Sequence, residues 1–202
     1  MRWIAALVML LGLNATAFAQ AEHSPTEHAW SRGTTLELFG GAAMTSSRTG
    51  GAFGAALAWE VTHRFEIEGT GTWVREHGDL EGFAADLKVR ANLTRPGTFV
   101  PYVAAGYGLY RSIVGAFSEQ VPAFYRRRMT AAGETGNTSY TDPAALVGAG
   151  VHLYVAEHFS LKPEVLLRFV MDDSQTHRFT TATIAVVYHV ERHVSSARHG
   201  VR

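Results

Sequence analysis

Alternation of polar and apolar residues is the feature that most constrains how this chain folds. In residues 65–73, every even position is polar and every odd position is apolar or glycine. Residues 83–93 and 159–171 show the same separation of charged from apolar positions. Because successive side chains of a β-strand point to opposite faces, each segment predicts a strand with one charged and one apolar face.

Eight segments with strand character follow one another along most of the chain. They cover residues 34–43, 51–61, 65–73, 83–93, 99–111, 144–155, 159–171 and 178–190. A tilted strand needs about 9–11 residues to cross a bilayer, whereas strands of soluble proteins average about five or six. The segments are long enough to cross. We therefore expect an all-β fold, an eight-stranded antiparallel up-and-down transmembrane β-barrel.

The connections between these segments differ in length. Three are short turns, at residues 62–64, 94–98 and 156–158, and the other four, at residues 44–50, 74–82, 112–143 and 172–177, are longer. Short periplasmic turns alternating with longer extracellular loops are typical of outer membrane barrels. This order predicts that both ends of the barrel segment lie on the periplasmic side.

The small residues indicate which face lies inside. Gly54, Gly148, Gly150 and Thr181 occupy the candidate lumen positions, while the opposite face is aliphatic. An eight-stranded barrel has an interior just wide enough for side chains to fill, so small residues there leave room for long charged ones. This favours charges inside and apolar side chains towards lipid, the reverse of a soluble barrel.

The N-terminus has the parts of a secretory signal peptide. Met1-Arg2 is positively charged, residues 3–13 are apolar, and Ala17-Phe18-Ala19 precedes a predicted cleavage site, with a second possible site at Ala21. An N-terminal core helix or membrane anchor is the alternative. We expect a signal peptide at 1–19, a flexible lead-in at 20–33, the barrel at 34–190 and a periplasmic tail at 191–202. Export with this fold predicts the outer membrane.

Composition excludes several classes of function. The chain has no cysteine, so disulfides, thiolate catalysis and cysteine metal sites are excluded. Eighteen Lys and Arg balance eighteen Asp and Glu, which gives no field to attract nucleic acid. Of the ten histidines only His152 lies in the middle of a predicted strand, and none has metal-ligand spacing. We expect no metal and no cofactor.

Two stretches resemble a known family. Residues 101–108, Pro-Tyr-Val-Ala-Ala-Gly-Tyr-Gly, and residues 148–154, followed by 159–164 and Arg168, resemble the small OmpA/OmpX-like outer membrane proteins. The resemblance covers residues 34–190 and implies an outer membrane barrel. Members commonly end on an aromatic residue of the last strand, whereas here residues 191–202 follow Tyr188-His189-Val190. We expect no peptidoglycan-binding domain of the kind that longer relatives carry after the barrel.

The charged positions of the lumen face form the main candidate site. They are Glu37, Glu60, Glu66, Glu68, Asp86, Lys88, Arg90, Lys162, Glu164 and Arg168. Buried charges must be paired, or they cost several kcal/mol each. A packed ion-pair network that plugs the barrel is therefore favoured over an ion path, which is the alternative of a narrow passive pore.

Enzyme activity is not expected. A lipid-modifying barrel enzyme needs a His-x-Ser pair facing the bilayer, but here the spacing occurs only as His158-Phe159-Ser160, at a turn, with Glu157 and Glu164 near. The long loop instead contains an aromatic and basic cluster that could contact lipopolysaccharide or a surface partner. Its members are Phe124, Tyr125, Arg126, Arg127 and Arg128. A mobile, solvated loop is the alternative.

These observations lead to one interpretation of function. We expect a monomeric outer membrane barrel with a structural, surface-interaction or envelope-integrity role. Its partners would be outer membrane lipid and lipopolysaccharide, with an extracellular partner possible through loop 112–143 and no nucleic acid. The alternatives are a lipid-modifying outer membrane enzyme, a soluble calycin-like carrier of small ligands, and a narrow passive pore.

Overall fold

The structure, a computed structural model, describes residues 33–45, 49–75, 80–94, 97–115, 121–133, 135–156, 158–172 and 176–190. The expected signal peptide, the lead-in up to residue 32 and the tail at 191–202 lie outside the described residues.

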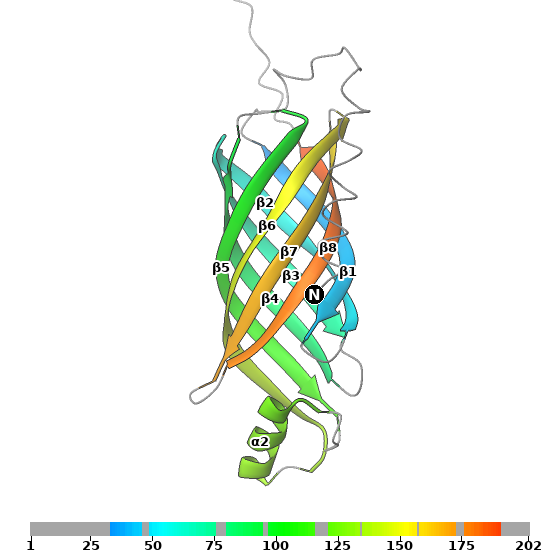
Figure 1. The fold of residues 1–202 in the computed structure, drawn as a ribbon, viewed down its shortest axis with the longest axis vertical. Coiled ribbons are helices and arrows are strands. Elements are labelled where there is room, and N and C mark those ends of the chain that lie inside the picture. The colour runs from blue at the N-terminus through cyan, green and yellow to red at the C-terminus, as the bar shows by residue number, and fades with distance from the viewer. Residues whose placement is uncertain are drawn as a thin grey trace, which may run out of the picture.

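Eight antiparallel strands form one closed barrel in which each strand pairs with its neighbours in sequence and β8 pairs with β1 (Figure 1). The all-β, up-and-down barrel predicted from the alternation is confirmed. The strands are β1 (Thr34–Met44), β2 (Thr49–Thr62), β3 (Phe65–Arg75), β4 (Leu80–Asn92), β5 (Phe99–Val114), β6 (Thr138–Ala156), β7 (Phe159–Met171) and β8 (Thr176–Val190). Closure satisfies the backbone hydrogen bonds of both edges, as a lipid environment requires.

The barrel has two different ends. Thr34 pairs with Val190, so the first and last strands begin and finish at the end that also holds the turns β2–β3, β4–β5 and β6–β7. We call this the turn end. The opposite end, which holds the other four connections and the single helix of the described chain, is the loop end (Figure 1).

Several strands are longer than predicted, so the difference in loop length is smaller. Only residues 45–48, 76–79 and 172–175 separate three of the strand pairs at the loop end, while the turn at 93–98 is longer than any of these. The long connection shrinks from 112–143 to 115–137. The distinction between turns and loops therefore depends mainly on this one connection.

Pro143 is the reason that β6 was predicted too short. It lies within β6 and pairs with Leu109 of β5, whereas pairing between β6 and β7 begins at Ala144. Residues 138–143 thus have β5 as their only strand partner in the described chain. Proline lacks a backbone N–H and is tolerated at such an edge position. The β5–β6 hairpin projects beyond the rim of the barrel.

Helix α2 (Ala123–Ala132) lies in the long connection at the loop end (Figure 1). Gly133 ends it in a left-handed conformation, with φ of 70°, and its N–H donates to the Thr130 carbonyl at 3.2 Å. Among the described residues, no helix combines the length and the apolar character needed to cross a membrane.

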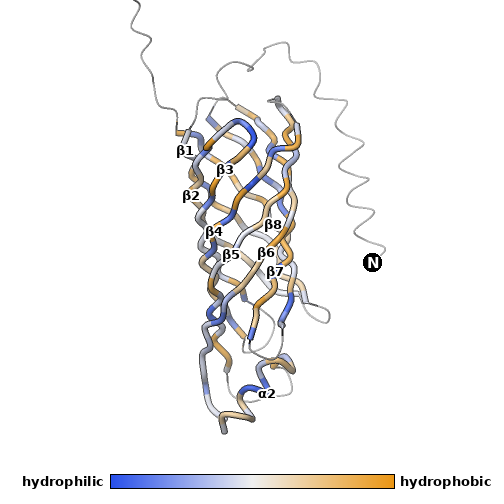
Figure 2. Tube along the Cα trace, turned by 90° about the vertical axis from the view of Figure 1, so that its left-hand side faces the viewer, coloured by the Kyte–Doolittle hydropathy of each residue, from blue (hydrophilic) through white to orange (hydrophobic). Residues whose placement is uncertain are grey.

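The two faces of the wall differ as the alternation predicted. Hydrophilic and hydrophobic residues alternate along the strands (Figure 2). Outward positions are apolar and exposed, including Leu38, Trp59, Leu87 and Ile184, each at least 61% exposed. Inward positions hold eleven of the fifteen strand charges of the described chain, and ten of these eleven are buried. The placement of charges inside and aliphatic side chains outside is confirmed.

Candidate functional site

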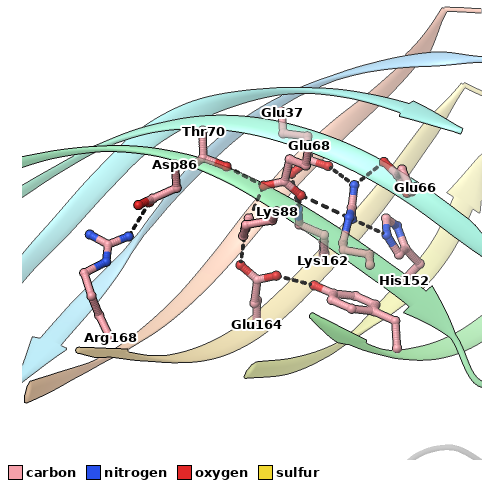
Figure 3. Close-up of polar contacts among 12 residues, drawn as sticks. Glu37, Glu66, Glu68, Thr70, Asp86, Lys88, His152, Lys162, Glu164 and Arg168 are labelled. Carbon is pink, nitrogen blue, oxygen red and sulfur yellow. Dashed lines mark hydrogen bonds and ion pairs between the residues drawn. The ribbon is translucent and has the colours of Figure 1, made fainter. Parts of the chain in front are cut away.

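Arg90 on β4 is the centre of the charged lumen. Its side chain is fully buried and contacts three carboxylates: Glu37 of β1 at 2.9 Å, Glu66 of β3, and Glu68 of β3 at 3.0 Å. Figure 3 labels these three carboxylates. A fourth group, the Nε2 atom of His152, lies 2.7 Å from Arg90 Nη1. One guanidinium therefore joins three strands by ion pairs and a fourth, β6, through His152.

Two lysines extend these contacts around the wall. Lys88 Nζ lies 2.7 Å from Glu68 and 3.0 Å from Glu164 of β7. Lys162 of β7 contacts Glu37 and lies 3.1 Å from Glu68. We call the seven connected charges the central cluster: Glu37, Glu66, Glu68, Lys88, Arg90, Lys162 and Glu164. It holds four carboxylates against three bases and spans β1, β3, β4 and β7.

Neutral side chains complete the hydrogen bonding of the central cluster. Tyr102 of β5 donates its hydroxyl to Glu164 at 2.9 Å, and Thr70 donates to Glu68 at 2.7 Å. Neither residue was among the predicted lumen positions, and His152 had no predicted role. Their inward register is visible in the alternation, because Tyr102 and Thr70 share even positions with inward neighbours. They were not predicted as part of the site because only charged lumen positions were included in it.

The remaining predicted lumen charges lie apart from the central cluster. Asp86 and Arg168 form a separate ion pair closer to the loop end (Figure 3). Glu60 faces inward near the turn end and is half-buried. No ion pair between described residues includes Glu60. The ten predicted positions thus divide into a cluster of seven, one pair and one separate carboxylate.

Glycines face large lumen side chains across the strand pairs. Gly106 pairs with Lys88, Gly108 with Asp86, and Gly150 with Tyr102. A Cβ atom at Gly150 would lie 2.4 Å from the Tyr102 hydroxyl, closer than atoms can approach. The glycines therefore provide the space that the long side chains fill, which is how so many charges fit in an eight-stranded barrel.

Towards the loop end, the lumen is apolar. A buried layer fills it there, made of Ala43, Ala52, Val74, Ala84, Tyr110, Ala144, Val170 and Phe179. The order along the inward face of β4 shows the sequence of layers: Arg90 and Lys88, then Asp86, then Ala84, and finally Leu80 at the rim. The charged region is thus covered by an apolar layer on the side of the loop end.

Helix α2 covers the loop end with a second apolar cluster. Phe124, Tyr125 and Met129 of the helix are buried with Leu80, Val114 and Val121. Arg128 of the same helix face contacts Asp142 of β6 at 2.7 Å and Asp172 at 3.4 Å, and its guanidinium lies 4.1 Å from the ring centroid of Tyr140. We call this arrangement the helical lid.

The aromatic and basic cluster of this loop is not presented to solvent as the sequence suggested. Phe124 and Tyr125 are buried, and Arg128 is held in ion pairs, because helix formation places these residues on one face that packs on the barrel. Burial lowers the pKa of Arg128, but its hydrogen bond with Asp142 and the charges of Asp142 and Asp172 outweigh it, so that the pKa is raised overall. Arg127 is exposed and Arg126 is half-buried.

Removing the lid's ion pairs should loosen the helix without unfolding the barrel. We expect Arg128→Gln to increase cleavage by chymotrypsin after Phe124 and Tyr125 about ten-fold, because a partly buried charged hydrogen bond contributes about 1.5 kcal/mol. Arg127→Gln, on the exposed face of the same helix, is the matched control and should leave the cleavage rate unchanged. Equal cleavage of the two variants would contradict the role given to Arg128.

A serine and a histidine meet near the turn end. Ser160 Oγ of β7 lies 2.9 Å from Nε2 of His189 on β8, and His158 Nδ1 lies 3.3 Å from the His189 carbonyl oxygen. The His158-Phe159-Ser160 spacing therefore does not bring His158 and Ser160 together as a pair. Ser160 is completely buried and faces the lumen, away from lipid. His177 and His189 also lie in strands, in addition to His152.

Metal ligands do not gather anywhere in the described part of the chain. No group of three or more His, Asp or Glu side chains there is arranged to hold a metal ion. The lumen histidine that contacts Arg90 takes part in hydrogen bonding with the charged network instead.

Comparison with known proteins identifies the fold. The N-terminal β-barrel domain of Pseudomonas aeruginosa OprF superimposes with a TM-score of 0.56 at 16% identity, covering 80% of this chain and 99% of that one. Neisserial surface protein A (NspA) gives 0.58 at 12% identity, covering 78% and 96%. The fold is that of small outer membrane β-barrels. No family model matches the sequence, and no curated protein matches it.

Proposed function

We propose that this chain is an exported, monomeric outer membrane protein whose barrel is a closed scaffold with a structural, surface-interaction or envelope-integrity role. The turn end would face the periplasm and the loop end the exterior, as in barrels of this type. The observation that carries the proposal is the inverted wall, with exposed apolar side chains outside and a filled, charge-paired lumen inside. A soluble calycin-like carrier requires the opposite arrangement.

A non-enzymatic, non-conducting role is part of the same proposal. The lumen contains the central cluster, then the apolar layer and then the helical lid, so a solute would have to displace all three. The serine and histidine that meet near the turn end lie on the lumen side of the wall, which argues against a lipid-modifying site there. The outer face of α2, with Arg126 and Arg127, is the part of this loop open to an extracellular partner.

Two measurements on the full-length protein test the proposal. We expect the folded protein to sediment with outer membranes and to change its mobility on detergent gels when boiled, as closed membrane barrels do. We also expect no steady current when it is inserted in a planar bilayer. Recovery in the soluble periplasmic fraction would contradict the membrane location, and steady ohmic channels would contradict the plug.

A further inference from the structure

The few charges on the outer wall are concentrated at one end of the barrel. Of the fifteen Asp, Glu, Lys and Arg residues in the described strands, only Arg75, Glu81, Arg111 and Arg178 point outward. All four lie in the part of their strands nearest the loop end. At the turn end, no outward position of the described strands carries a charge, and most are aromatic or aliphatic, for example Phe65, Phe99 and Tyr188.

Two of these arginines have no acidic partner among the described residues. Arg75 and Glu81 lie 3.6 Å apart, so they neutralise each other. Arg111 donates only to the neutral hydroxyl of Ser139, at 3.3 Å, and no carboxylate in the described chain forms an ion pair with Arg111 or Arg178. Within the described strands, the outward wall at the loop end therefore has two exposed positive charges in excess.

The height of these arginines matches a lipid headgroup region. Arg111 is twelve residues from Phe99 along β5, and Arg178 is twelve residues from Val190 along β8. Twelve residues of a tilted strand rise about 30 Å, slightly more than the apolar band of about 25 Å on such barrels. Long arginine side chains at this level can extend along apolar surface and place their charge among the headgroups.

Each arginine also has an aromatic neighbour on its outward face. Arg111 pairs across the strands with Phe83, and Arg178 pairs with Phe169. Leu109, which precedes Arg111 on the same face, is 54% exposed. Aromatic side chains mark the boundary between apolar chains and headgroups. The guanidinium groups thus stand at the upper boundary of the apolar belt.

We infer that Arg111 and Arg178 bind phosphate groups of a phosphorylated glycolipid in the outer leaflet, that is, of lipopolysaccharide. The inference rests on the proposed function, because it needs the loop end to face the exterior. A planar guanidinium binds phosphate through two parallel hydrogen bonds, which makes arginine well suited to this ligand. The absence of outward charge at the turn end of the described strands restricts this binding to one leaflet.

The two arginines contact different phosphate groups. Arg111 and Arg178 are three strand spacings apart around the wall, about 14 Å. Through the strand pairs, Arg178 is in register with position 107 rather than 111, so Arg111 is displaced by a further distance of about 13 Å along the strand direction. This is the stagger that tilted strands show between residues at similar height. One phosphate cannot span that distance. Their contributions to lipid binding should therefore be independent and additive.

The test compares lipid binding by variants of the full-length folded protein. Purified barrel in zwitterionic detergent is titrated with lipopolysaccharide, and bound lipid is measured by co-sedimentation. We expect Arg111→Gln and Arg178→Gln each to weaken binding about five-fold, and the double variant about twenty-five-fold. Arg64→Gln, an exposed arginine at the turn end, is the matched control and should bind as the unmodified protein does.

Further arms distinguish the source of the phosphate. Enzymatically dephosphorylated lipopolysaccharide should bind weakly and equally to all variants, and inorganic phosphate should not compete. Unchanged binding by the double variant, tight binding of the dephosphorylated lipid, or competition by free phosphate would each overturn the inference. Heat-dependent gel mobility checks that every variant is folded. If the protein sediments with outer membranes while the double variant keeps its lipid, this inference fails and the proposed function stands.

Discussion

Replacing Arg90 with methionine is expected to lower the free energy of unfolding by about 3–5 kcal/mol, the cost of leaving a buried charge without its partner. Arg90 is the only base among the described residues that contacts Glu66, whereas Glu37 keeps Lys162 and Glu68 keeps both lysines. Methionine fills much of the volume but donates no hydrogen bond. Urea unfolding of the refolded barrel in detergent, followed by tryptophan fluorescence, measures the change.

A second substitution separates the loss of pairing from a simple loss of packing. If the unpaired Glu66 carboxylate carries much of the cost, Arg90→Met combined with Glu66→Gln should be more stable than Arg90→Met alone. Arg64→Met at the turn end is the exposed control and should change stability by less than about 0.5 kcal/mol. If the loss of unfolding free energy in the double variant equals the sum of the losses in Arg90→Met and Glu66→Gln alone, the two residues do not interact in the folded barrel.

The set of inward residues was predictable from the sequence because side-chain direction in a strand is a local property. A period of two assigns Glu66, Glu68, Lys88 and Arg90 to one face without knowledge of any other strand. The same reasoning assigned Lys162 and Glu164 to the lumen. Alternation separated the aliphatic face from the charged face, but the small residues at the lumen positions were needed to place the aliphatic face outside. The strand lengths and the order of short and long connections then indicated a membrane barrel.

The choice of partners inside the lumen was not predictable in the same way. Lys162 contacts Glu37, which is 125 residues away, while Asp86 meets Arg168 rather than the central cluster. These ion pairs depend on how far each strand is shifted along its neighbours around the whole barrel. A single sequence without pairing information does not fix that shift, so the division into a cluster and a separate pair had to come from the structure.

The helical lid was missed for a different reason. The predicted connection extended to Pro143, although Pro143 lies inside β6, and the inward-facing Asp142 before it was therefore assigned to a loop. Asp142 is the main ion-pair partner of Arg128, so the contact that holds α2 against the barrel could not be predicted from the sequence. The apolar side of the short helix has no partner within its own segment, and its burial becomes apparent only once the mouth of the barrel is known.

Steric filling of the lumen leads to the second large expected effect, at Gly108 of β5. A Cβ atom at this position would lie 2.1 Å from the carbonyl oxygen of Ala85 and 2.6 Å from Oδ1 of Asp86. Part of this clash is with backbone of a paired strand, which cannot move without disturbing the barrel, and the rest displaces the carboxylate that pairs with Arg168. We expect Gly108→Val to lower the free energy of unfolding by at least about 3 kcal/mol.

Gly40 supplies a matched control because it is also a strand glycine but faces outward. No atom lies within 4 Å of a Cβ built at this position. A valine there adds apolar surface towards lipid and favours the extended backbone, so Gly40→Val should leave the unfolding midpoint unchanged or raise it. Gly108→Ala, with a smaller clash, should lie between the unmodified protein and Gly108→Val. If both valine variants unfolded at the same urea concentration, the lumen would have free space next to Gly108. The interpretation that its glycines leave only enough room for the charged side chains would then be wrong.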